Sequence, residues 1–252
     1  MSKAHQRIIR EKKEKSPPSL SLFNDKPLNI DIKKATIKPV NYKTAQKIIL
    51  EYEWLGTMGQ CMYAYGIYFD NICGGVVCFG LPSSPIAGNL CGDKYQANAI
   101  CLERGACVYW AHPHSASKLI SYACKDISKR TKYRIFYAYS DESAGEIGTI
   151  YQACNWYYLG KMASGGSQIK MVNREGKLLS SRHLIEYAKQ IDRNINKTND
   201  ARNILLKYGW KVKRTNPKMK YVWFEGSKSE RKSLKKKLKY DIKPYPKREI
   251  FK

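Results

Sequence analysis

The stretch of sequence that decides the fold is YSDESAGEIGTIYQACNWYYLG, residues 139–160. It reads as an acidic turn, a short helix over Glu146–Asn155 and a strand over Trp156–Met162. Aromatic residues recur in it at mixed helical and strand spacing, which also fits simple core packing: Tyr151, Trp156 and Tyr158. Polar residues interleave with them: Asp141, Thr149, Gln152 and Asn155. Because a pure core needs no polar groups, we expect this stretch to border a functional site.

Upstream, a strand is expected over Ala35–Val40. A helix over Thr44–Tyr52 follows, with Asn41 as its N-cap and apolar residues at helical spacing. Two β-rich runs, Met62–Phe69 and Ile72–Phe79, are separated by Asp70-Asn71, a dipeptide typical of hairpin turns. The long loop over Gly80–Gly92 that follows has the length of a lid or a substrate loop.

A third strand is predicted over Asn98–Trp110, a helix from Ser115 onward and a further strand over Tyr133–Tyr139. One side of the helix is apolar: Leu119, Ile120, Ala123 and Ile127. The order is strand, helix, hairpin, strand, helix, strand, helix, strand. This order predicts an α/β (α+β) fold with a mixed central sheet flanked by helices.

Three regions are expected. Residues 1–28 are polar and basic, and should form a flexible arm. Residues 29–165 form the core, and residues 166–252 form a basic, mainly helical extension packed on it. Within the extension the pattern predicts helices over Ser181–Ile195, over Ala201–Tyr208 with Gly209 as the C-cap, and over Lys228–Lys239, and a short strand over Tyr221–Phe224.

Charge is the most unusual property of the composition. The chain has 46 Lys and Arg against 21 Asp and Glu, a formal net charge of +25. Residues 201–252 alone carry 18 Lys and Arg against 4 Asp and Glu, among scattered aromatic residues. Such an excess predicts a polyanionic partner, most simply nucleic acid, although a solvated helix face and a basic tail would give a similar count.

The eight cysteines include no CxxC pair and lie mostly in apolar stretches, so we expect reduced packing residues. The His112-Pro113-His114 sequence is a weak metal signal, because no Cys or carboxylate lies nearby at ligand spacing. We therefore assign no metal ligands, and the metal requirement stays open. No apolar run approaches the roughly 20 residues that span a bilayer, and the N-terminus is charged. A cytoplasmic protein without membrane contact is expected.

The segment Ile150–Gly160 resembles the LYEKxGFxxxG ending of the GNAT acyltransferases. In that fold two sheet strands splay apart to admit the pantetheine arm of coenzyme A, and a helix tyrosine faces the thiolate leaving group. The resemblance places Tyr151 in this role and implies acetyl-CoA or a related acyl-CoA as the donor. The usual R/Q-x-x-G-x-G/A loop of these enzymes is not present after the third strand in that form.

Read more narrowly, GTIYQAxNWxYLG is similar to the phage Mom family of DNA adenine-modification proteins, a divergent branch of the same fold. The resemblance covers residues 40–160 and, more loosely, the Lys-Pro-Tyr-Pro-Lys-Arg run at 243–248. It implies an Arg on the strand, Arg104, and a Ser on the helix, Ser117, at the cofactor. A family His-Tyr pair is replaced here by Glu53-Trp54, so the role of the histidine is either lost or taken by Glu53 as a general base.

Chemistry alone supports some of these positions. Thioester aminolysis needs amide N–H groups for the pyrophosphate, which the helix start with Ser115 and Ser117 offers, and an acid for the departing thiolate. Arg104 lies in an apolar stretch and needs an anion, either Glu103 or Asp141 or a ligand phosphate. Asp141 follows a strand, where open α/β sheets place reactive groups, although helix caps are also common there.

The resemblance therefore implies transfer of a carbamoylmethyl-like, acyl-derived group to the exocyclic amine of adenine in double-stranded DNA. Substrate contacts are expected from Trp54, Gln152 and Asn155, since aromatic and amide groups recognise bases. Phosphate contacts are expected from seven basic residues: Lys211, Lys213, Arg214, Lys235, Lys236, Lys247 and Arg248. Two alternatives remain, an N-acyltransferase acting on another amine in protein, tRNA or a hypermodified base, and a basic nucleic-acid-binding module without activity.

Overall fold

The computed structural model describes residues 3–15, 27, 29–82, 85–162, 169–176, 178–179, 184–214 and 216–247 of the chain. The chain folds into two compact units. Unit 1 comprises Met1–Lys161 and Met219–Lys252, and unit 2 comprises Met162–Lys218. Within the described ranges, every helix is too short or too polar to cross a bilayer.

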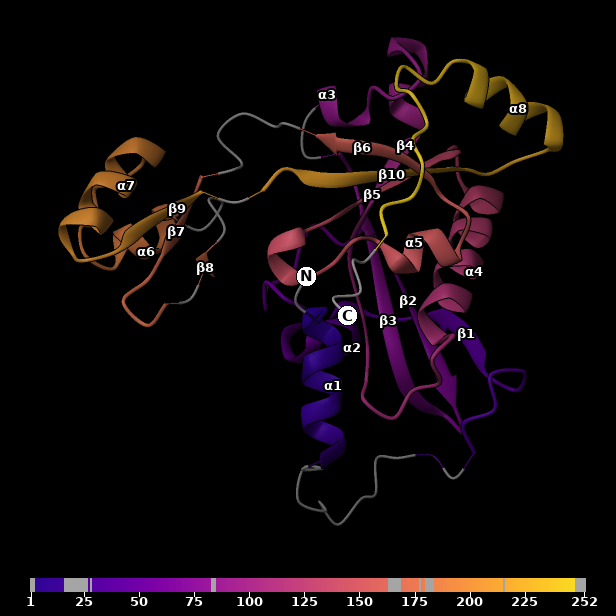
Figure 1. The fold of residues 1–252 in the computed structure, drawn as a ribbon, viewed down its shortest axis with the longest axis horizontal. Coiled ribbons are helices and arrows are strands. Elements are labelled where there is room, and N and C mark those ends of the chain that lie inside the picture. Colours follow the sequence, from indigo (N-terminus) through magenta and orange to yellow (C-terminus); the bar gives the residue numbers. More distant parts are fainter. Residues whose placement is uncertain are drawn as a thin grey trace. The chain divides into compact units, whose positions relative to one another are not determined.

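Unit 1 is built on a seven-stranded sheet with the order β1-β2-β3-β4-β5-β10-β6 (Figure 1). Its strands are β1 Thr36–Pro39, β2 Tyr63–Phe69, β3 Ile72–Gly80, β4 Ala99–Cys107, β5 Ile135–Ser140, β6 Tyr157–Met162 and β10 Lys218–Phe224. β4 and β5 run parallel, whereas β1–β2, β2–β3, β3–β4 and β5–β10 are antiparallel pairs. The predicted mixed α/β architecture is confirmed.

Two helices cover opposite faces of this sheet. α2 (Tyr42–Tyr52) packs on the face that carries Val76 and Cys78 of β3. α4 (Ser115–Arg130) packs on the face that carries Val77 and Phe79, the alternate residues of the same strand. Alternation of side chains along a strand thus gives the sheet two buried faces, as the apolar composition of β3 requires.

Local sequence signals set several boundaries as predicted. The side chain of Asn41 accepts a hydrogen bond of 2.9 Å from the amide of Thr44, which caps α2. Asp70 and Asn71 have φ angles of 44° and 66°, the left-handed values that a tight hairpin turn between β2 and β3 needs. The predicted hairpin is confirmed.

The helix that carries Tyr151 is shorter than predicted. α5 spans only Thr149–Ala153, because the chain adopts left-handed φ angles on both sides of it, 73° at Gly148 and 59° at Asn155. Residues before it form the short turn η2 (Glu142–Ala144) rather than helix.

The C-terminal region also differs from the expected extension at 166–252. β10 returns to unit 1 and pairs with β5, burying Met219 and Tyr221 in the core around α4. α8 (Lys228–Lys236) and the tail follow it within unit 1. The run Tyr221–Phe224 predicted a short strand, but the insertion of β10 into the sheet depends on partners far away in sequence.

Unit 2 has a core of its own. A small sheet with the order β8-β7-β9 is formed by β7 Ile169–Val172, β8 Leu178–Leu179 and β9 Lys211–Arg214. Two helices, α6 (Leu184–Lys189) and α7 (Thr198–Lys207), contribute most of the buried residues: Leu184, Ala188, Ala201 and Leu205. α6 ends before the predicted Ile195, and residues 181–183 lie outside the described part.

The expected N-terminal arm contains a helix, α1 (His5–Lys15). None of its residues is fully buried, so it is held to unit 1 mainly by side-chain hydrogen bonds and partial packing. The expected loop at Gly80–Gly92 contains a short helix, α3 (Pro85–Gly88), and residues 83–84 lie outside the described part. A 3-10 turn, η1 (Asp93–Asn98), then leads into β4.

Candidate active site

The central feature of unit 1 is a gap between β4 and β5. Their pairing begins at Ala99–Ile135 and ends at Leu102–Ala138, yet β4 continues to Cys107. Beyond Leu102, β4 continues its pairing with β3, and among the described residues it has none with β5, so the two strands part, as the resemblance to acyltransferases implied. A cleft of about 750 Å³ occupies this region. We call it the inner cleft.

Three segments besides α1 contribute most of the wall of the inner cleft. β4 contributes Leu102–Cys107, the approach to α4 contributes His112–His114 with Ala116 and Ser117, and the turn before α5 with its first residues contributes Glu146–Tyr151. The register of β3 against β4 shifts between Cys78 and Phe79, opposite Glu103, so β4 is irregular where it borders the cleft.

Arg104 and Glu53 meet at this cleft, whereas the sequence offered Glu103 or Asp141 as the protein partner of Arg104. Glu53 Oε2 lies 3.8 Å from Arg104 Nε and accepts a hydrogen bond of 2.7 Å from the amide of Leu55. The Arg104 guanidinium also donates to the carbonyl oxygens of Thr57 (2.9 Å) and Glu103 (2.6 Å). Glu53 is therefore engaged both by the guanidinium of Arg104 and by the amide of Leu55.

Tyr151 lies on α5 and lines the inner cleft, although only 8% of its surface is exposed. Its ring packs against Trp156 and Tyr221 at centroid distances of 5.3 and 5.2 Å. Burial raises the pKa of its phenol well above the ordinary value, so the group stays protonated. Tyr151 is thus both a core residue and a protonated donor bordering the cleft.

Of the two serines predicted at the start of α4, one lines the inner cleft. Ser117 lines the cleft, and its hydroxyl donates 3.1 Å to the carbonyl of His114. Ser115 is fully buried, and its Oγ has no hydrogen-bond partner among the described residues. It does not line the cleft in this structure.

Four other predicted residues lie outside the described cleft lining. Asp141 caps η2, accepting 2.9 Å from the amide of Ser143, which is the turn-capping role left open above. Asn155 is exposed in the turn after α5, where its left-handed backbone ends the helix. Trp54 packs edge-on against His5, 5.3 Å between centroids, and its buried indole N–H lacks a partner among the described residues. Gln152 lies on the far side of α5, described below.

Sequence reasoning missed several residues that line the cleft. Glu103, Tyr139, Ser140 and Glu146 all border it. Ser140 is 2% exposed, and its hydroxyl has no hydrogen-bond partner in the described part of the chain, so it remains available to a ligand. A Cβ atom on Gly59 would lie 3.0 Å from Glu103 Oε2, so this glycine makes room for the carboxylate. The register shift beside Glu103 had no signal in the sequence.

α1 closes one side of the inner cleft. The Gln6 amide donates 2.8 Å to the Gly105 carbonyl of β4, and the Arg10 guanidinium donates to the carbonyls of Tyr109 (3.1 Å) and Ala111 (2.7 Å). Lys13 also pairs with Glu51 of α2. A segment expected to be a flexible arm therefore forms part of the cleft wall.

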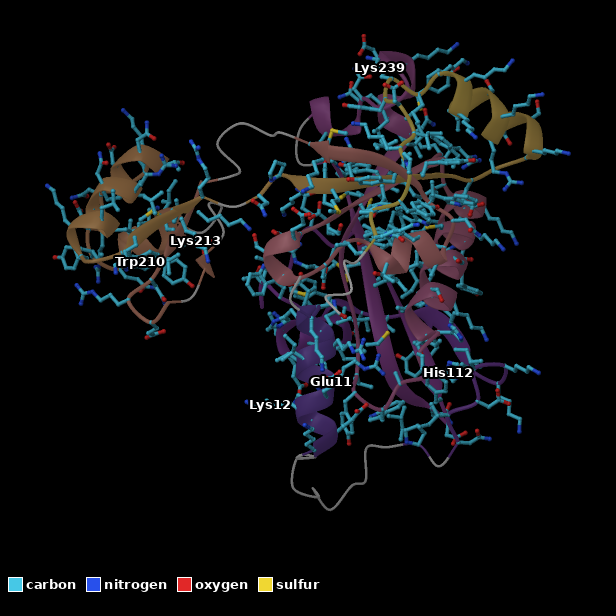
Figure 2. All side chains as sticks on the ribbon, viewed as in Figure 1. Glu11, Lys12, His112, Trp210, Lys213 and Lys239 are labelled. Atoms are coloured by element: carbon cyan, nitrogen blue, oxygen red, sulfur yellow. The ribbon has the colours of Figure 1, made fainter. Side chains whose placement is uncertain are left out.

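The predicted phosphate-binding residues lie at the surface. Lys235 and Lys236 are exposed on α8, and Lys247 is exposed in the tail. In unit 2, all four residues of β9 are exposed, including Lys211, Lys213 and Arg214. Lys213 is labelled in Figure 2. Arg248 lies outside the described residues.

Comparison with solved structures finds acetyltransferases. An N-acetyltransferase from Staphylococcus aureus Mu50 is 11% identical, with 75% of this chain and 98% of that chain covered and a TM-score of 0.40. A Bacillus subtilis acetyltransferase in complex with CoA is 9% identical, covering 77% and 100%, also with a TM-score of 0.40. For the Salmonella typhimurium acetyltransferase that modifies ribosomal protein L7/L12, identity is 11%, coverage 65% and 64%, and the TM-score 0.35.

This chain thus spans less than two thirds of the length of the ribosomal-protein acetyltransferase. With TM-scores below 0.5 these likenesses add nothing to the assignment. Among curated proteins, none matches significantly.

The model of the Mom protein family matches residues 34–247. This range includes the whole sheet of unit 1 and all of unit 2. It also includes the walls of the inner cleft other than α1. The chain belongs to the Mom protein family.

Proposed function

We propose that this protein transfers an acyl-derived group from an acyl-coenzyme A to the exocyclic N6 amine of adenine in double-stranded DNA, so that an amide C–N bond forms at N6 as the C–S bond of the thioester breaks. The observation that carries the proposal is the inner cleft. It opens between diverging strands of a Mom-family protein and brings together Glu53, Arg104, Ser117 and Tyr151. Its volume of about 750 Å³ is in the range of small-molecule sites.

The residues of the cleft fit a donor of this class. Past Leu102 the described residues give no strand partner to the β4 edge that faces the gap, and the Gly105 carbonyl accepts a hydrogen bond from the Gln6 amide. Backbone groups of this kind pair with the amides of an extended arm. The unpartnered hydroxyl of Ser140 offers a further polar contact. When bound, an acyl-coenzyme A supplies an activated acyl carbon as a thioester.

The chain's own residues would manage the protons. An aromatic amine attacking an acyl carbon must lose a proton, and a nearby carboxylate is suited to accept it. Glu53 and Glu103 both line the cleft, but Glu53 is engaged by Arg104 and the Leu55 amide. We take Glu103, the other of these two carboxylates, as the candidate proton acceptor. On the other side of the gap, the protonated phenol of Tyr151 would donate to the departing sulfur.

The DNA partner is supported by charge. The chain carries a formal charge of +25, and its exposed lysines on α8 and β9 are suited to phosphate oxygens. Because the N6 amine of adenine lies inside a base pair, the base would have to leave the stack or be approached along the major groove.

Purified protein incubated with radiolabelled acetyl-coenzyme A and three separate acceptors tests the proposal. The acceptors are duplex DNA, bulk tRNA and a lysine-rich protein. Label that enters DNA, and is lost with Glu103→Gln but kept with the exposed-site control Lys33→Gln, supports DNA modification. Label in tRNA or protein alone would instead favour an acyltransferase for another amine. No label in any acceptor, with DNA binding retained, would favour the binding module.

A further inference from the structure

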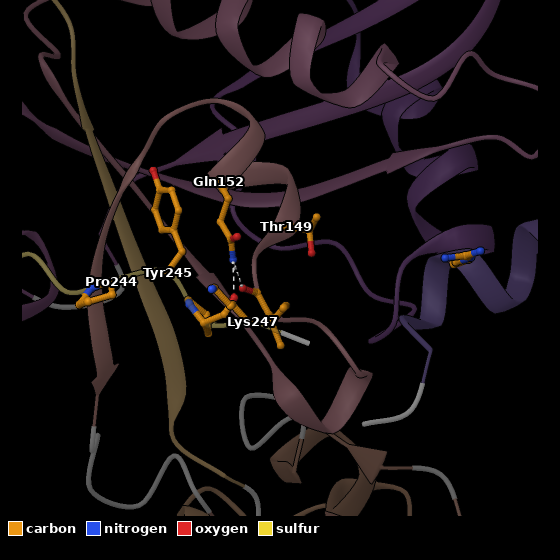
Figure 3. Close-up of a pocket in the computed structure, with 8 residues that line it drawn as sticks. Thr149, Gln152, Pro244, Tyr245 and Lys247 are labelled. Carbon is orange, nitrogen blue, oxygen red and sulfur yellow. Dashed lines mark hydrogen bonds between the residues drawn. The ribbon is translucent and has the colours of Figure 1, made fainter. Parts of the chain in front are cut away.

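A second hollow lies next to the inner cleft. It has a volume of about 830 Å³ and lies between α1, α5 and the tail of unit 1 (Figure 3). We call it the outer cavity. Its lining combines two cations, two polar side chains and a tyrosine between two prolines: Arg7, Lys247, Thr149, Gln152, Pro244, Tyr245 and Pro246, with Ile147 beside them.

The tail wall of the outer cavity is fixed to the core. The amide of Lys243 donates 2.8 Å to the carbonyl of Tyr158, and the Tyr245 hydroxyl donates 2.8 Å to the carbonyl of Trp156. Gln152 Nε2 approaches the Pro246 carbonyl at 3.3 Å and the Ile147 carbonyl at 3.1 Å (Figure 3). The tail thus holds a ring and a lysine over α5 in a defined place.

The opposite wall is held by α1. Gln6 and Arg10 anchor this helix to β4 and to the loop after it, one residue before and three residues after Arg7. Arg7 Nε pairs with Glu11 at 2.9 Å, which orients the guanidinium, and its side chain is 69% exposed. The other two nitrogens of the guanidinium can meet an anion.

The two hollows adjoin each other. Arg7, Ile147 and Thr149 line both the inner cleft and the outer cavity. A ligand whose reactive end lies in the inner cleft would therefore reach the outer cavity by extending past these three residues.

We propose that the outer cavity is a nucleotide subsite, in which Arg7 and Lys247 hold a phosphate group while Tyr245 and Gln152 face the ring. Guanidinium and ammonium groups recognise phosphate, aromatic rings stack on bases, and a glutamine amide can pair with adenine. This inference rests on the proposed function, which supplies two sources of the same chemistry. One is the nucleotide end of coenzyme A, and the other is a nucleotide of the DNA acceptor.

Calorimetric titration of the full chain tests the subsite. The double variant Arg7→Ala with Lys247→Ala is compared with wild type, using coenzyme A, pantetheine and a 20-base-pair duplex as probes. Loss of two charge-assisted contacts lowers the affinity for the ligand that occupies the subsite by about tenfold or more. If the donor occupies the subsite, the affinity for coenzyme A falls in the double variant, while the affinity for pantetheine, which has no nucleotide, stays the same. If DNA occupies the subsite, the affinity for the duplex falls and the affinity for coenzyme A stays the same.

Lys12→Ala is the matched control, because Lys12 is exposed on α1 and lines neither hollow. It removes a charge without touching the subsite, and should change each affinity less than twofold. Arg7→Lys with native Lys247 should retain most of the binding. Equal affinities of the double variant and Lys12→Ala for both coenzyme A and duplex would overturn the subsite. Failure of the wild-type protein to bind coenzyme A would refute the proposed donor. The affinity of the double variant for the duplex would then test the subsite by itself.

Discussion

Gly148 packs directly against the ring of Tyr221. A Cβ atom on Gly148 would lie 2.3 Å from that ring, and the Tyr221 hydroxyl donates 2.6 Å to the carbonyl of Ile147 beside it. This close approach sets where α5 begins, and α5 carries Tyr151 to the inner cleft. The position of the candidate proton donor thus depends on a residue of β10 that follows it by 70 positions.

Gly148→Ala is therefore expected to destabilise unit 1. A left-handed φ costs an alanine about 1–2 kcal/mol, and overlap with a buried ring adds about 1–3 kcal/mol. Gly92→Ala is the control, because Gly92 also has a positive φ, 99°, but nothing lies within 4 Å of its Cβ position. Urea denaturation should give a larger loss for Gly148→Ala. Equal losses would mean that the contact with Tyr221 is unimportant.

Tyr151→Phe should separate chemistry from packing. Phenylalanine keeps the contacts with Trp156 and Tyr221, so the free energy of unfolding should change by less than about 1.5 kcal/mol. If the phenol donates to the leaving group, DNA modification should fall by about 10²- to 10⁴-fold. Tyr42→Phe, on an exposed tyrosine of α2, should change neither quantity. Full modification by Tyr151→Phe would remove the phenol from the mechanism.

Arg104→Met should cost stability as well as activity. The substitution removes the ion pair with Glu53 and leaves two carbonyl oxygens without their guanidinium donor. Breaking a mostly buried charge pair typically costs about 3–5 kcal/mol. Arg7→Met, on a side chain that is 69% exposed, should cost less than about 1 kcal/mol. Chemical denaturation of both variants measures the difference, and similar losses would contradict the account of the Arg104 site.

Lys220 of β10 carries a buried ammonium group whose pKa is lowered. It is 2% exposed, donates 3.1 Å to the Ala87 carbonyl and lies within 5.1–5.5 Å of three tyrosine rings: Tyr137, Tyr139 and Tyr240. Burial lowers its pKa to about 8, although the neighbouring Cys101 opposes the shift. The folded protein therefore releases this proton at a lower pH than the unfolded chain, whose lysine pKa is 10.5.

Unfolding consequently takes up a proton between about pH 8 and pH 10.5, and the Lys220 contribution to stability rises with pH across that window. Below pH 8 the penalty for the buried charge is fully present. We expect Lys220→Met to be more stable than wild type at pH 7, and the advantage to shrink by up to about 1.4 kcal/mol per pH unit above pH 8. Thermal unfolding at several pH values measures this difference. A constant difference would mean that Lys220 titrates normally.

DNA binding should depend on salt through the exposed lysines. If Lys235 and Lys236 contact phosphates, their double alanine variant should lower the slope of log K against log salt by about 1.8. The same holds for Lys211 and Lys213 of β9, which tests unit 2 separately. Lys33→Ala, at an exposed turn before β1, serves as the control and should leave the slope unchanged. Unchanged slopes for both double variants would remove these surfaces from the interface.

Local signals predicted much of unit 1. Asp70-Asn71 gave the hairpin, Asn41 gave the start of α2, and the apolar spacing from Leu119 to Ile127 gave the buried side of α4. Each depends on residues within a few positions of one another. The divergence of β4 from β5 came from the resemblance, since no single residue encodes it.

Features that depend on distant partners were not predictable from local patterns. α1 lacks a buried residue, and its anchor on Gly105 joins residues 99 positions apart. Glu103 reaches the cleft beside a register shift between β3 and β4. Asp141 followed a strand, as reactive groups often do, but its carboxylate caps a turn, and sequence alone could not separate these two roles.

Mass spectrometry of nucleosides from the DNA of cells that produce this protein tests the central claim most directly. We expect a deoxyadenosine of increased mass with wild type, its loss with Tyr151→Phe or Glu103→Gln, and its persistence with Tyr42→Phe. Unmodified deoxyadenosine alone, in cells that contain folded wild-type protein, would contradict the proposed modification of DNA.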